Sequence, residues 1–136
     1  MIQQTSKLIS FQNIGEEPIG FISIADHQKS VPFEIKRVYW TYNTPSNITR
    51  GNHAHKSLSQ VLIAINGILK VELESTKGKI STFCLSDPNT GLLVPPIHWR
   101  KITFSQSAVL LCLASEVYDE KDYIRDYSEF KNLHEV

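Results

Sequence analysis

Short runs of β-branched and aromatic residues recur along the chain, separated by turn residues such as Gly, Pro, Asn and Asp. In one run Leu69, Val71 and Leu73 alternate with charged neighbours, which is the period of a strand with one buried and one solvated face. Short strands with turn signals between them are typical of an all-β sandwich or barrel. We therefore expect strands at Leu8–Phe11, Gly20–Ala25, Phe33–Tyr42, Gln60–Ile65, Ile68–Glu74, Ile80–Leu85, Gly91–Val94, Lys101–Phe104 and Ala108–Ala114.

Two local patterns add detail to this all-β picture. Asn66-Gly67 joins two of the runs, and this dipeptide accepts the positive φ angles of a type I′ turn. It predicts a hairpin in which the flanking strands pair antiparallel. From Glu120 to Leu133 the apolar and aromatic residues follow helical spacing, which predicts a C-terminal helix packed against the β body.

The run Arg50-Gly51-Asn52-His53-Ala54-His55-Lys56 carries the chemistry of the chain. On a strand, successive side chains point to opposite faces, so His53 and His55 share a face and reach one small ligand. Imidazole titrates near neutral pH, with a reference pKa of about 6.5. The pair is therefore suited either to binding a metal or to acid/base catalysis.

Length and composition limit the classes of protein. The 136 residues predict one domain, residues 1–136, with a sizeable core. Lys plus Arg equal Asp plus Glu at 14 each, so no nucleic acid or membrane partner is expected. Cys84 and Cys112 lie in apolar runs without metal-type spacing, which favours reduced, buried thiols. With no secretory leader and no run near the roughly 20 apolar residues of a membrane span, we expect a soluble cytoplasmic protein.

The histidine pair in an all-β chain resembles the first motif of the cupin superfamily. His53 and His55 occupy its two histidine positions, but Gln60 stands in place of the glutamate ligand. In the second motif Arg100 takes the place of the third histidine. A neutral amide is a weak ligand and a guanidinium has no acceptor, so acid/base use is favoured over a metal. His98 lies two residues from Arg100 and keeps a metal site open as an alternative.

A series of short segments carries a closer resemblance that covers most of the chain. The segments are Arg37-Val38-Tyr39, Arg50 to Lys56, Gln60-Val61-Leu62, Gly91 to Pro96, Trp99, Phe104-Ser105, Leu113-Ala114-Ser115 and Tyr118 to Arg125. In this order they resemble the metal-free cupin-type dTDP-4-keto-6-deoxy-glucose 3,4-ketoisomerases, the WxcM-like sugar ketoisomerases. Asn52 departs from the pattern, because family members often carry a bulky residue there.

The resemblance implies a cupin jelly-roll homodimer that binds a dTDP-linked 4-keto-6-deoxy sugar in the mouth of each barrel. It implies an isomerase with neither metal nor nicotinamide cofactor, serving deoxysugar biosynthesis for a surface glycan such as an O-antigen or S-layer glycan. His55 is then expected to be the base at carbon, and His53 the group that moves protons at the oxygens. The sequence alone leaves this order open.

Further residues are candidates for contacts with the substrate. Arg50, Tyr39 and Arg100 carry donors that could stabilise a developing enolate oxygen. Other candidates have simpler structural alternatives, such as a solvated strand edge for Lys56 and a core position for Trp99. The diphosphate calls for cationic side chains, and the candidates for it are Arg37, Arg50 and Lys56. Trp99 is a candidate for stacking on the base, and Gln60 for fixing the tautomer of a histidine.

Two other functions stay open at this stage. One is a metal-dependent cupin enzyme, such as an epimerase, isomerase or dioxygenase. The other is a cupin that binds a nucleotide-sugar without catalysis. The configuration of the 3-keto product, gluco or galacto, depends on placement at the ångström scale, and no sequence pattern determines it.

Overall fold

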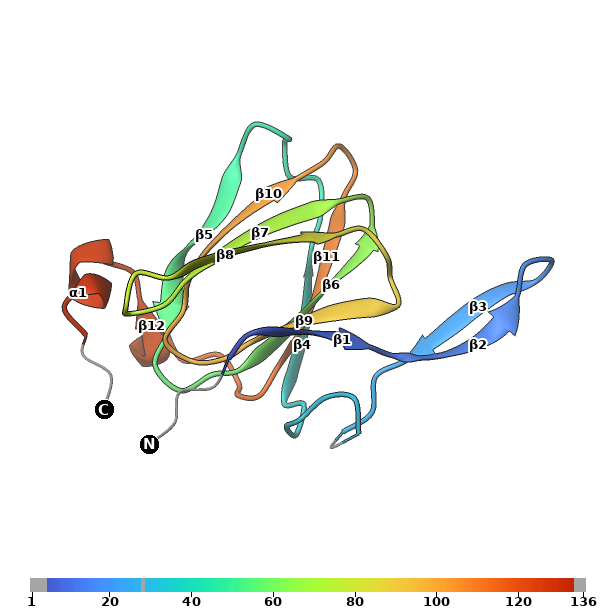
Figure 1. Ribbon diagram of the computed structural model, residues 1–136, viewed down its shortest axis with the longest axis horizontal. Coiled ribbons are helices and arrows are strands. Elements are labelled where there is room, and N and C mark those ends of the chain that lie inside the picture. The colour runs from blue at the N-terminus through green and yellow to red at the C-terminus, as the bar shows by residue number, and fades with distance from the viewer. Residues whose placement is uncertain (1–4, 28, 134–136) are drawn as a thin grey trace.

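Two five-stranded antiparallel sheets face each other in the computed structural model, which describes residues 5–27 and 29–133 (Figure 1). The first sheet contains, in spatial order, β1 (Lys7–Ser10), β9 (Thr90–Val94), β6 (Gln60–Asn66), β11 (Val109–Ala114) and β4 (Arg37–Thr41). The second contains β12 (Tyr123–Ile124), β5 (Thr49–His55), β10 (Trp99–Phe104), β7 (Leu69–Glu74) and β8 (Ile80–Leu85).

The chain crosses repeatedly between the two sheets, since β6 and β7, and again β9 and β10, are consecutive but lie in opposite sheets. This is a cupin-type jelly roll, and the predicted fold class is confirmed. The space between the sheets is filled by apolar side chains from both inner faces. These include Leu62, Leu92, Leu110, Leu69, Val71, Ile102 and Phe104.

The predicted pairing across Asn66-Gly67 is wrong, although both flanking strands exist. β6 pairs with β11 and β9, whereas β7 pairs with β10 and β8. Gly67 has a φ of 73° but Asn66 has no positive φ, and a type I′ turn needs positive values at both residues. The Asn66 amide instead donates to the Ser107 carbonyl, and the Ile68 N–H donates to the Ser105 hydroxyl. The dipeptide therefore forms a corner between the sheets.

The outer face of the first sheet carries a second apolar cluster, in which Val61 and Leu113 pack with Phe11 and Val31. Gly91 makes this packing feasible, because a Cβ there would lie 2.7 Å from Val61 Cγ1 and 2.8 Å from Phe11 Cζ. Segments before β4 thus cover part of this face. The predicted strand Phe33–Tyr42 is correspondingly shorter, because only Arg37–Thr41 pairs in the sheet.

A two-stranded hairpin of β2 (Gln12–Glu16) and β3 (Gly20–Ile24) projects from the jelly roll (Figure 1). The sequence predicted β3 and missed β2. All five β2 residues are exposed, so its single apolar residue, Ile14, gives no periodic signal. Cys84 is exposed, contrary to expectation, whereas Cys112 is a buried free thiol of the core.

The C-terminal segment is not the continuous helix that was predicted from Glu120 to Leu133. It contains a 3₁₀ turn, η1 (Glu120–Asp122), then β12, then the five-residue helix α1 (Tyr127–Lys131). Asp126 caps α1 by accepting from two backbone N–H groups, and so begins the helix late. Over the described residues, no helix is long and apolar enough to cross a membrane.

Candidate active site

His53 and His55 lie on the inner face of β5, and their ring centroids are 4.9 Å apart. The predicted common face is confirmed. The strand is not regular, because Asn52 is an extra residue between the pairs His53–Arg100 and Gly51–Lys101. Asn52 has a φ of 54°, a left-handed conformation that Asn tolerates better than bulkier residues. The bulge lets the Gly51 carbonyl accept a 2.9 Å hydrogen bond from Nδ1 of His53.

Gly51 is required by close packing as well as by its backbone conformation. Its φ is 99°, a region that side chains rarely adopt. A Cβ at this position would lie 2.9 Å from the Arg100 carbonyl oxygen and 3.0 Å from Arg100 Cγ. The glycine of the R-G-x-H run thus allows β5 to approach the arginine that faces the histidines.

Both histidines are neutral at physiological pH. Burial, and then the positive charge of Arg100, lowers the pKa of His53 from 6.5 to about 4. The same two causes, in the same order, lower the pKa of His55 to about 2. Desolvation disfavours the charged imidazolium and a nearby cation disfavours it further. The pair therefore offers unprotonated nitrogens that can accept a proton.

A buried chain of polar groups lies beside the histidines and joins the two sheets. Arg100 of β10 is 2% exposed, and one of its Nη atoms donates to Oε1 of Gln60 on β6. The Gln60 amide donates to the Tyr39 hydroxyl at 2.7 Å and to Cys112 Sγ at 3.2 Å. Burial raises the pKa of the Tyr39 hydroxyl and of the Cys112 thiol, so both stay neutral. Gln60 contacts Arg100 and Tyr39, and no hydrogen bond joins it to a histidine within the described residues.

Arg100 and Arg37 are cations without a carboxylate partner among the described residues. Nε of Arg100, and Nε and Nη2 of Arg37, are buried and have no hydrogen-bond partner there. Arg37 lies over the Tyr39 and Tyr118 rings, at 5.1 and 5.7 Å from their centroids. Unpaired guanidinium donors beside neutral histidines make the site suited to an anionic ligand.

The C-terminal segment adds residues that the sequence did not assign to the site. Tyr123 pairs with His55 in the β12–β5 ladder, and its ring centroid lies 4.3 Å from His55 and 5.1 Å from His53. Arg125 lies 4.2 Å from the centroid of the Tyr123 ring. Oδ2 of Asp122 lies 3.5 Å from Nδ1 of His55. These residues are 65 or more positions from β5, and their helical spacing masked the pairing.

Three of the predicted contact residues lie apart from the histidine pair. Lys56 is exposed just after β5, and Arg50 is exposed at the other end of that strand, in an open groove with Trp40 and Tyr42. Trp99 is 5% exposed and packs against Tyr127 and Phe130 of α1, with ring centroids 5.2 and 5.7 Å away. Its neighbour Arg100 faces the histidines, so Trp99 points to the opposite side of β10.

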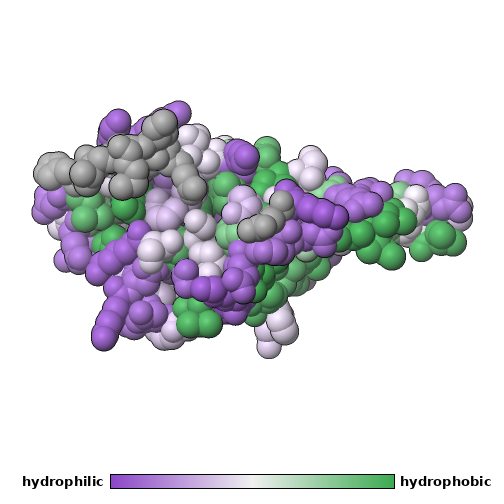
Figure 2. Space-filling model, turned by 90° about the horizontal axis from the view of Figure 1, so that it is seen from below, coloured by the Kyte–Doolittle hydropathy of each residue, from purple (hydrophilic) through white to green (hydrophobic). Residues whose placement is uncertain are grey.

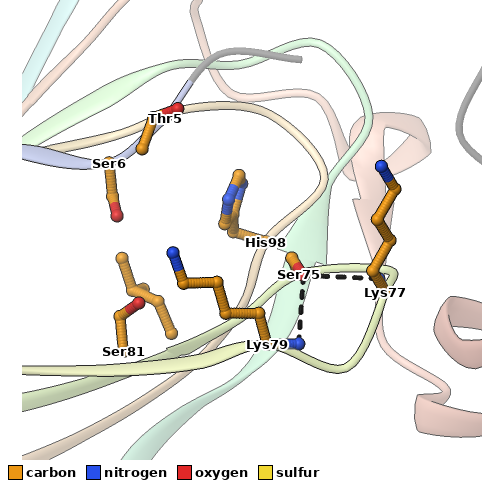
Figure 3. Close-up of a pocket in the computed structure, with 8 residues that line it drawn as sticks. Thr5, Ser6, Ser75, Lys77, Lys79, Ser81 and His98 are labelled. Atoms are coloured by element: carbon orange, nitrogen blue, oxygen red, sulfur yellow. Dashed lines mark hydrogen bonds between the residues drawn. The ribbon is translucent and has the colours of Figure 1, made fainter.

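His98 lines a separate pocket of about 170 Å³, between the start of the first strand and the β7–β8 turn (Figure 3). It precedes β10, and its Nδ1 shares a 3.0 Å hydrogen bond with the Pro96 carbonyl. Ser6, Ser75 and Lys79 share the pocket. Within residues 5–27 and 29–133, no group of three or more His, Cys, Asp or Glu side chains is arranged to hold a metal ion.

The fold and the site together define a cupin-type jelly roll with a neutral histidine pair beside a buried arginine. The family model FdtA, described as WxcM-like, C-terminal, matches residues 4–135, and the chain belongs to this family. The family resemblance inferred from the sequence is thereby confirmed.

Several characterised proteins are similar to this chain over nearly its whole length. A TDP-4-oxo-6-deoxy-alpha-D-glucose-3,4-oxoisomerase from Aneurinibacillus thermoaerophilus is 41% identical, over 93% of this chain and 90% of that protein. A mutant of the 3,4-ketoisomerase QdtA from Thermoanaerobacterium thermosaccharolyticum, in complex with TDP-4-keto-6-deoxyglucose, is 39% identical with a TM-score of 0.90, covering 96% and 94% of the two chains. The TDP-quinovose 3,4-ketoisomerase WlaRB from Campylobacter jejuni is 40% identical with a TM-score of 0.89, covering 96% and 99%.

Proposed function

We propose that this chain is a TDP-sugar 3,4-ketoisomerase that converts TDP-4-keto-6-deoxyglucose to a TDP-3-keto-6-deoxyhexose. The observation that carries the proposal is the neutral histidine pair, 4.9 Å between ring centroids, beside the buried cation of Arg100. Membership of the family supports the reaction class. The substrate is supported by the name of the Aneurinibacillus relative and by the ligand bound to the QdtA mutant.

The reaction moves two protons and needs no external oxidant or reductant. A base removes the hydrogen at C3, which is acidic because it is α to the C4 ketone, and the electron pair forms a C3–C4 double bond as the C4 oxygen is protonated. The resulting 3,4-enediol receives a proton at C4 and loses the proton of its C3 hydroxyl. The product has the ketone at C3 and the hydroxyl at C4, and the enzyme returns to its starting state.

The geometry supports a separate role for each histidine. The His53 Nδ1–H is engaged by the Gly51 carbonyl, which leaves Nε2 to exchange protons with the sugar oxygens. His55 is the base at carbon, because it is fully buried and neutral and has no hydrogen bond to the described protein that would occupy its lone pair. Two acid/base groups on one face suffice for the isomerisation.

Cationic groups stabilise the negative charge of the bound substrate and of the enediolate. Arg100 is buried beside the histidines, where a fixed charge acts strongly on an oxygen that becomes anionic in the transition state. The neutral Tyr39 hydroxyl, which already accepts from Gln60, is a second candidate at this position. Arg37 has unpartnered Nε and Nη2 donors for the diphosphate.

Conversion of the substrate, followed by proton NMR, tests this proposal. Wild-type protein and a His27→Asn control, which alters an exposed histidine outside the site, are expected to replace the 4-keto signals with those of a 3-keto sugar. His55→Asn is expected to slow conversion by about 100-fold or more, because a positioned acid/base group contributes on the order of 10² to 10⁴. A wild-type protein that leaves the substrate unchanged would refute the proposal.

The same samples separate the two competing functions. Stoichiometric bound metal, with activity lost on chelation, would support a metal-dependent cupin enzyme instead. Binding of TDP-4-keto-6-deoxyglucose without any turnover would support a non-catalytic nucleotide-sugar binding protein. The configuration of the product at C4 is read from the coupling constants in the same spectra.

We also infer that the chain assembles as a homodimer. Four large apolar side chains of the projecting hairpin are exposed, namely Ile14, Ile19, Phe21 and Ile22. Apolar residues on the outer face of the first sheet, Val38, Trp40 and Ile65, are 47%, 60% and 45% exposed. Figure 2 shows hydrophobic surface that continues from the body onto the hairpin. Contiguous apolar surface of this kind marks a protein–protein contact, and a second copy of the chain offers a complementary surface.

Sedimentation of the purified chain tests this assembly. We expect a species of twice the mass of the chain, and a Phe21→Asp, Ile22→Asp variant that sediments at half that mass. A wild-type monomer at micromolar concentration would contradict the inference.

Two remaining expectations have support in the structure. The two free thiols support residence in a reducing compartment, the cytoplasm. The shared core of the two sheets supports a single catalytic domain over residues 1–136.

A further inference from the structure

The end of β5 is held against the C-terminal segment by main-chain hydrogen bonds. Tyr123 and Ile124 of β12 pair with His55 and Ala54, and the Lys56 N–H donates to the Asp122 carbonyl at 2.8 Å. The position of Asp122 relative to His55 is thus set by the backbone on both sides. This arrangement brings together residues 67 positions apart in the sequence.

The Asp122 carboxylate is oriented by several donors. Its Oδ1 accepts from the Ser57 N–H at 2.8 Å and from the Ser57 hydroxyl at 2.7 Å. Its Oδ2 accepts from the Leu58 N–H at 3.3 Å, and the same oxygen lies 3.5 Å from Nδ1 of His55. The Asp122 side chain is only 14% exposed, so solvent screens this contact weakly.

His55 has two ring nitrogens in different surroundings. Its side chain is fully buried, and neither nitrogen makes a hydrogen bond within the described residues. Nδ1 faces Asp122 at a distance beyond that of an ordinary hydrogen bond, as catalytic contacts often are before the substrate binds. Among the described residues, the side chains that act most strongly on the charge of the ring or contact it are cationic or neutral: Arg100, Arg37, Arg125, His53 and Tyr123. Among residues 5–27 and 29–133, Asp122 is the carboxylate within ion-pair distance of the ring.

We infer that Asp122 is a positioning residue for His55. It holds the proton on Nδ1, so that Nε2 presents its lone pair to the sugar. When Nε2 takes the proton from C3, His55 becomes an imidazolium, which burial and the nearby cationic side chains disfavour. The Asp122 carboxylate partly offsets this positive charge. The inference rests on the proposed ketoisomerase function and adds a residue, distant in the sequence, that sets the tautomer of the base.

The variant Asp122→Asn, compared with Ser57→Ala, tests this role. The asparagine oxygen can still accept from Ser57, which leaves the amide NH₂ facing His55 and favours the tautomer with its proton on Nε2. Ser57→Ala removes one bond that orients the carboxylate but keeps the carboxylate itself beside His55. Each variant removes one hydrogen bond at this loop anchor, the Leu58 N–H bond in Asp122→Asn and the Ser57 hydroxyl bond in Ser57→Ala, so Ser57→Ala shows the effect of losing one anchoring bond while the carboxylate is kept.

The first measurement needs no turnover. In protein labelled with ¹⁵N-histidine, the ring nitrogens of His55 report its tautomer, with His55→Asn assigning the signals. We expect the Nδ1–H form in wild type and Ser57→Ala, and the Nε2–H form in Asp122→Asn. A wild-type His55 with its proton on Nε2, or a tautomer unchanged in Asp122→Asn, would overturn the inference.

The second measurement is the kinetics of the isomerisation. Asp122→Asn is expected to lower kcat about 10- to 100-fold with little change in KM, a share of what a positioned acid/base group contributes. Ser57→Ala is expected to keep kcat within about 3-fold, because it removes only a neutral hydroxyl donor and leaves the Asp122 carboxylate beside His55. Equal kcat in wild type and Asp122→Asn would overturn the inference. An inactive wild type would refute the proposed function, whereas the tautomer measurement judges the role of Asp122 on its own.

Discussion

The dependence of activity on pH is a direct consequence of the burial of the histidine pair. An exposed histidine with a pKa of 6.5 loses its basic form as the pH falls below neutrality. Here burial and Arg100 lower the pKa of His53 to about 4 and that of His55 to about 2. Both bases should therefore stay unprotonated well into the acid range, and kcat/KM should change little between pH 8 and pH 5.

The size of the effect follows from the fraction of neutral imidazole. At pH 5.5 a base with a pKa of 6.5 is only about 10% neutral, whereas one with a pKa near 4 is about 97% neutral. The two cases differ about 10-fold in kcat/KM at this pH, and the difference grows with each further unit of acidity. Burial is the larger cause of the pKa shift and Arg100 the next. An Arg100→Met variant should therefore lose activity at a higher pH than the wild type does, but still at a pH below 6.5.

Initial rates with TDP-4-keto-6-deoxyglucose below its KM give this profile, because kcat/KM reports the pKa values of the free enzyme. Circular dichroism at each pH keeps loss of activity separate from loss of fold. An acidic limb centred near pH 6.5 in the wild type would refute the argument from burial and charge. If Arg100→Met loses activity at the same pH as the wild type or at a lower pH, the contribution of the Arg100 charge to the pKa shift would be refuted.

Other consequences concern stability and packing. Between about pH 6.5 and pH 4 the unfolded chain binds a proton at His53, whereas the folded chain does not. The unfolding free energy is therefore highest above this range and falls as the pH drops through it. In denaturant titrations at pH 7 and pH 5, the wild-type protein should lose about 2 kcal/mol of unfolding free energy through His53, and His53→Gln should not show this part of the loss. Gly51→Ala should lower the unfolding free energy by about 1–3 kcal/mol and reduce kcat, because its Cβ meets the Arg100 backbone. Trp99→Ala should cost about 3–5 kcal/mol in thermal unfolding while leaving KM for the nucleotide-sugar nearly unchanged, since the ring packs on α1; a large rise in KM without loss of stability would contradict this.

Much of the fold could be predicted, because alternation of apolar and polar residues reports directly on sheet faces. The pattern at Leu69, Val71 and Leu73 corresponds to a strand of the second sheet with these residues buried. Pairing partners could not be predicted in the same way. Asn66-Gly67 indicates that the chain turns, yet whether it turns within a sheet or between sheets depends on contacts with Ser105 and Ser107, some 40 residues away.

The candidate site could be predicted where its residues lie close together on one strand. His53 and His55 share a face because of their spacing alone, whereas Asp122 and Tyr123 reach them only through the pairing of β12 with β5. The helical spacing of the tail was misleading, because two residues of a strand followed by one short helix give nearly the same pattern. Trp99 and Arg100 are neighbours in the sequence, but only Arg100 faces the histidines.

Transfer of solvent deuterium into the sugar tests the central claim, that the histidine pair moves a proton between C3 and C4. We predict that, in deuterated water, wild type and the His27→Asn control give a 3-keto product that carries deuterium at C4, and slowly exchange the C3 hydrogen of recovered TDP-4-keto-6-deoxyglucose. His55→Asn should do neither at a comparable rate. Absence of deuterium at both C3 and C4 in the wild-type reaction, or full incorporation by His55→Asn, would contradict the account.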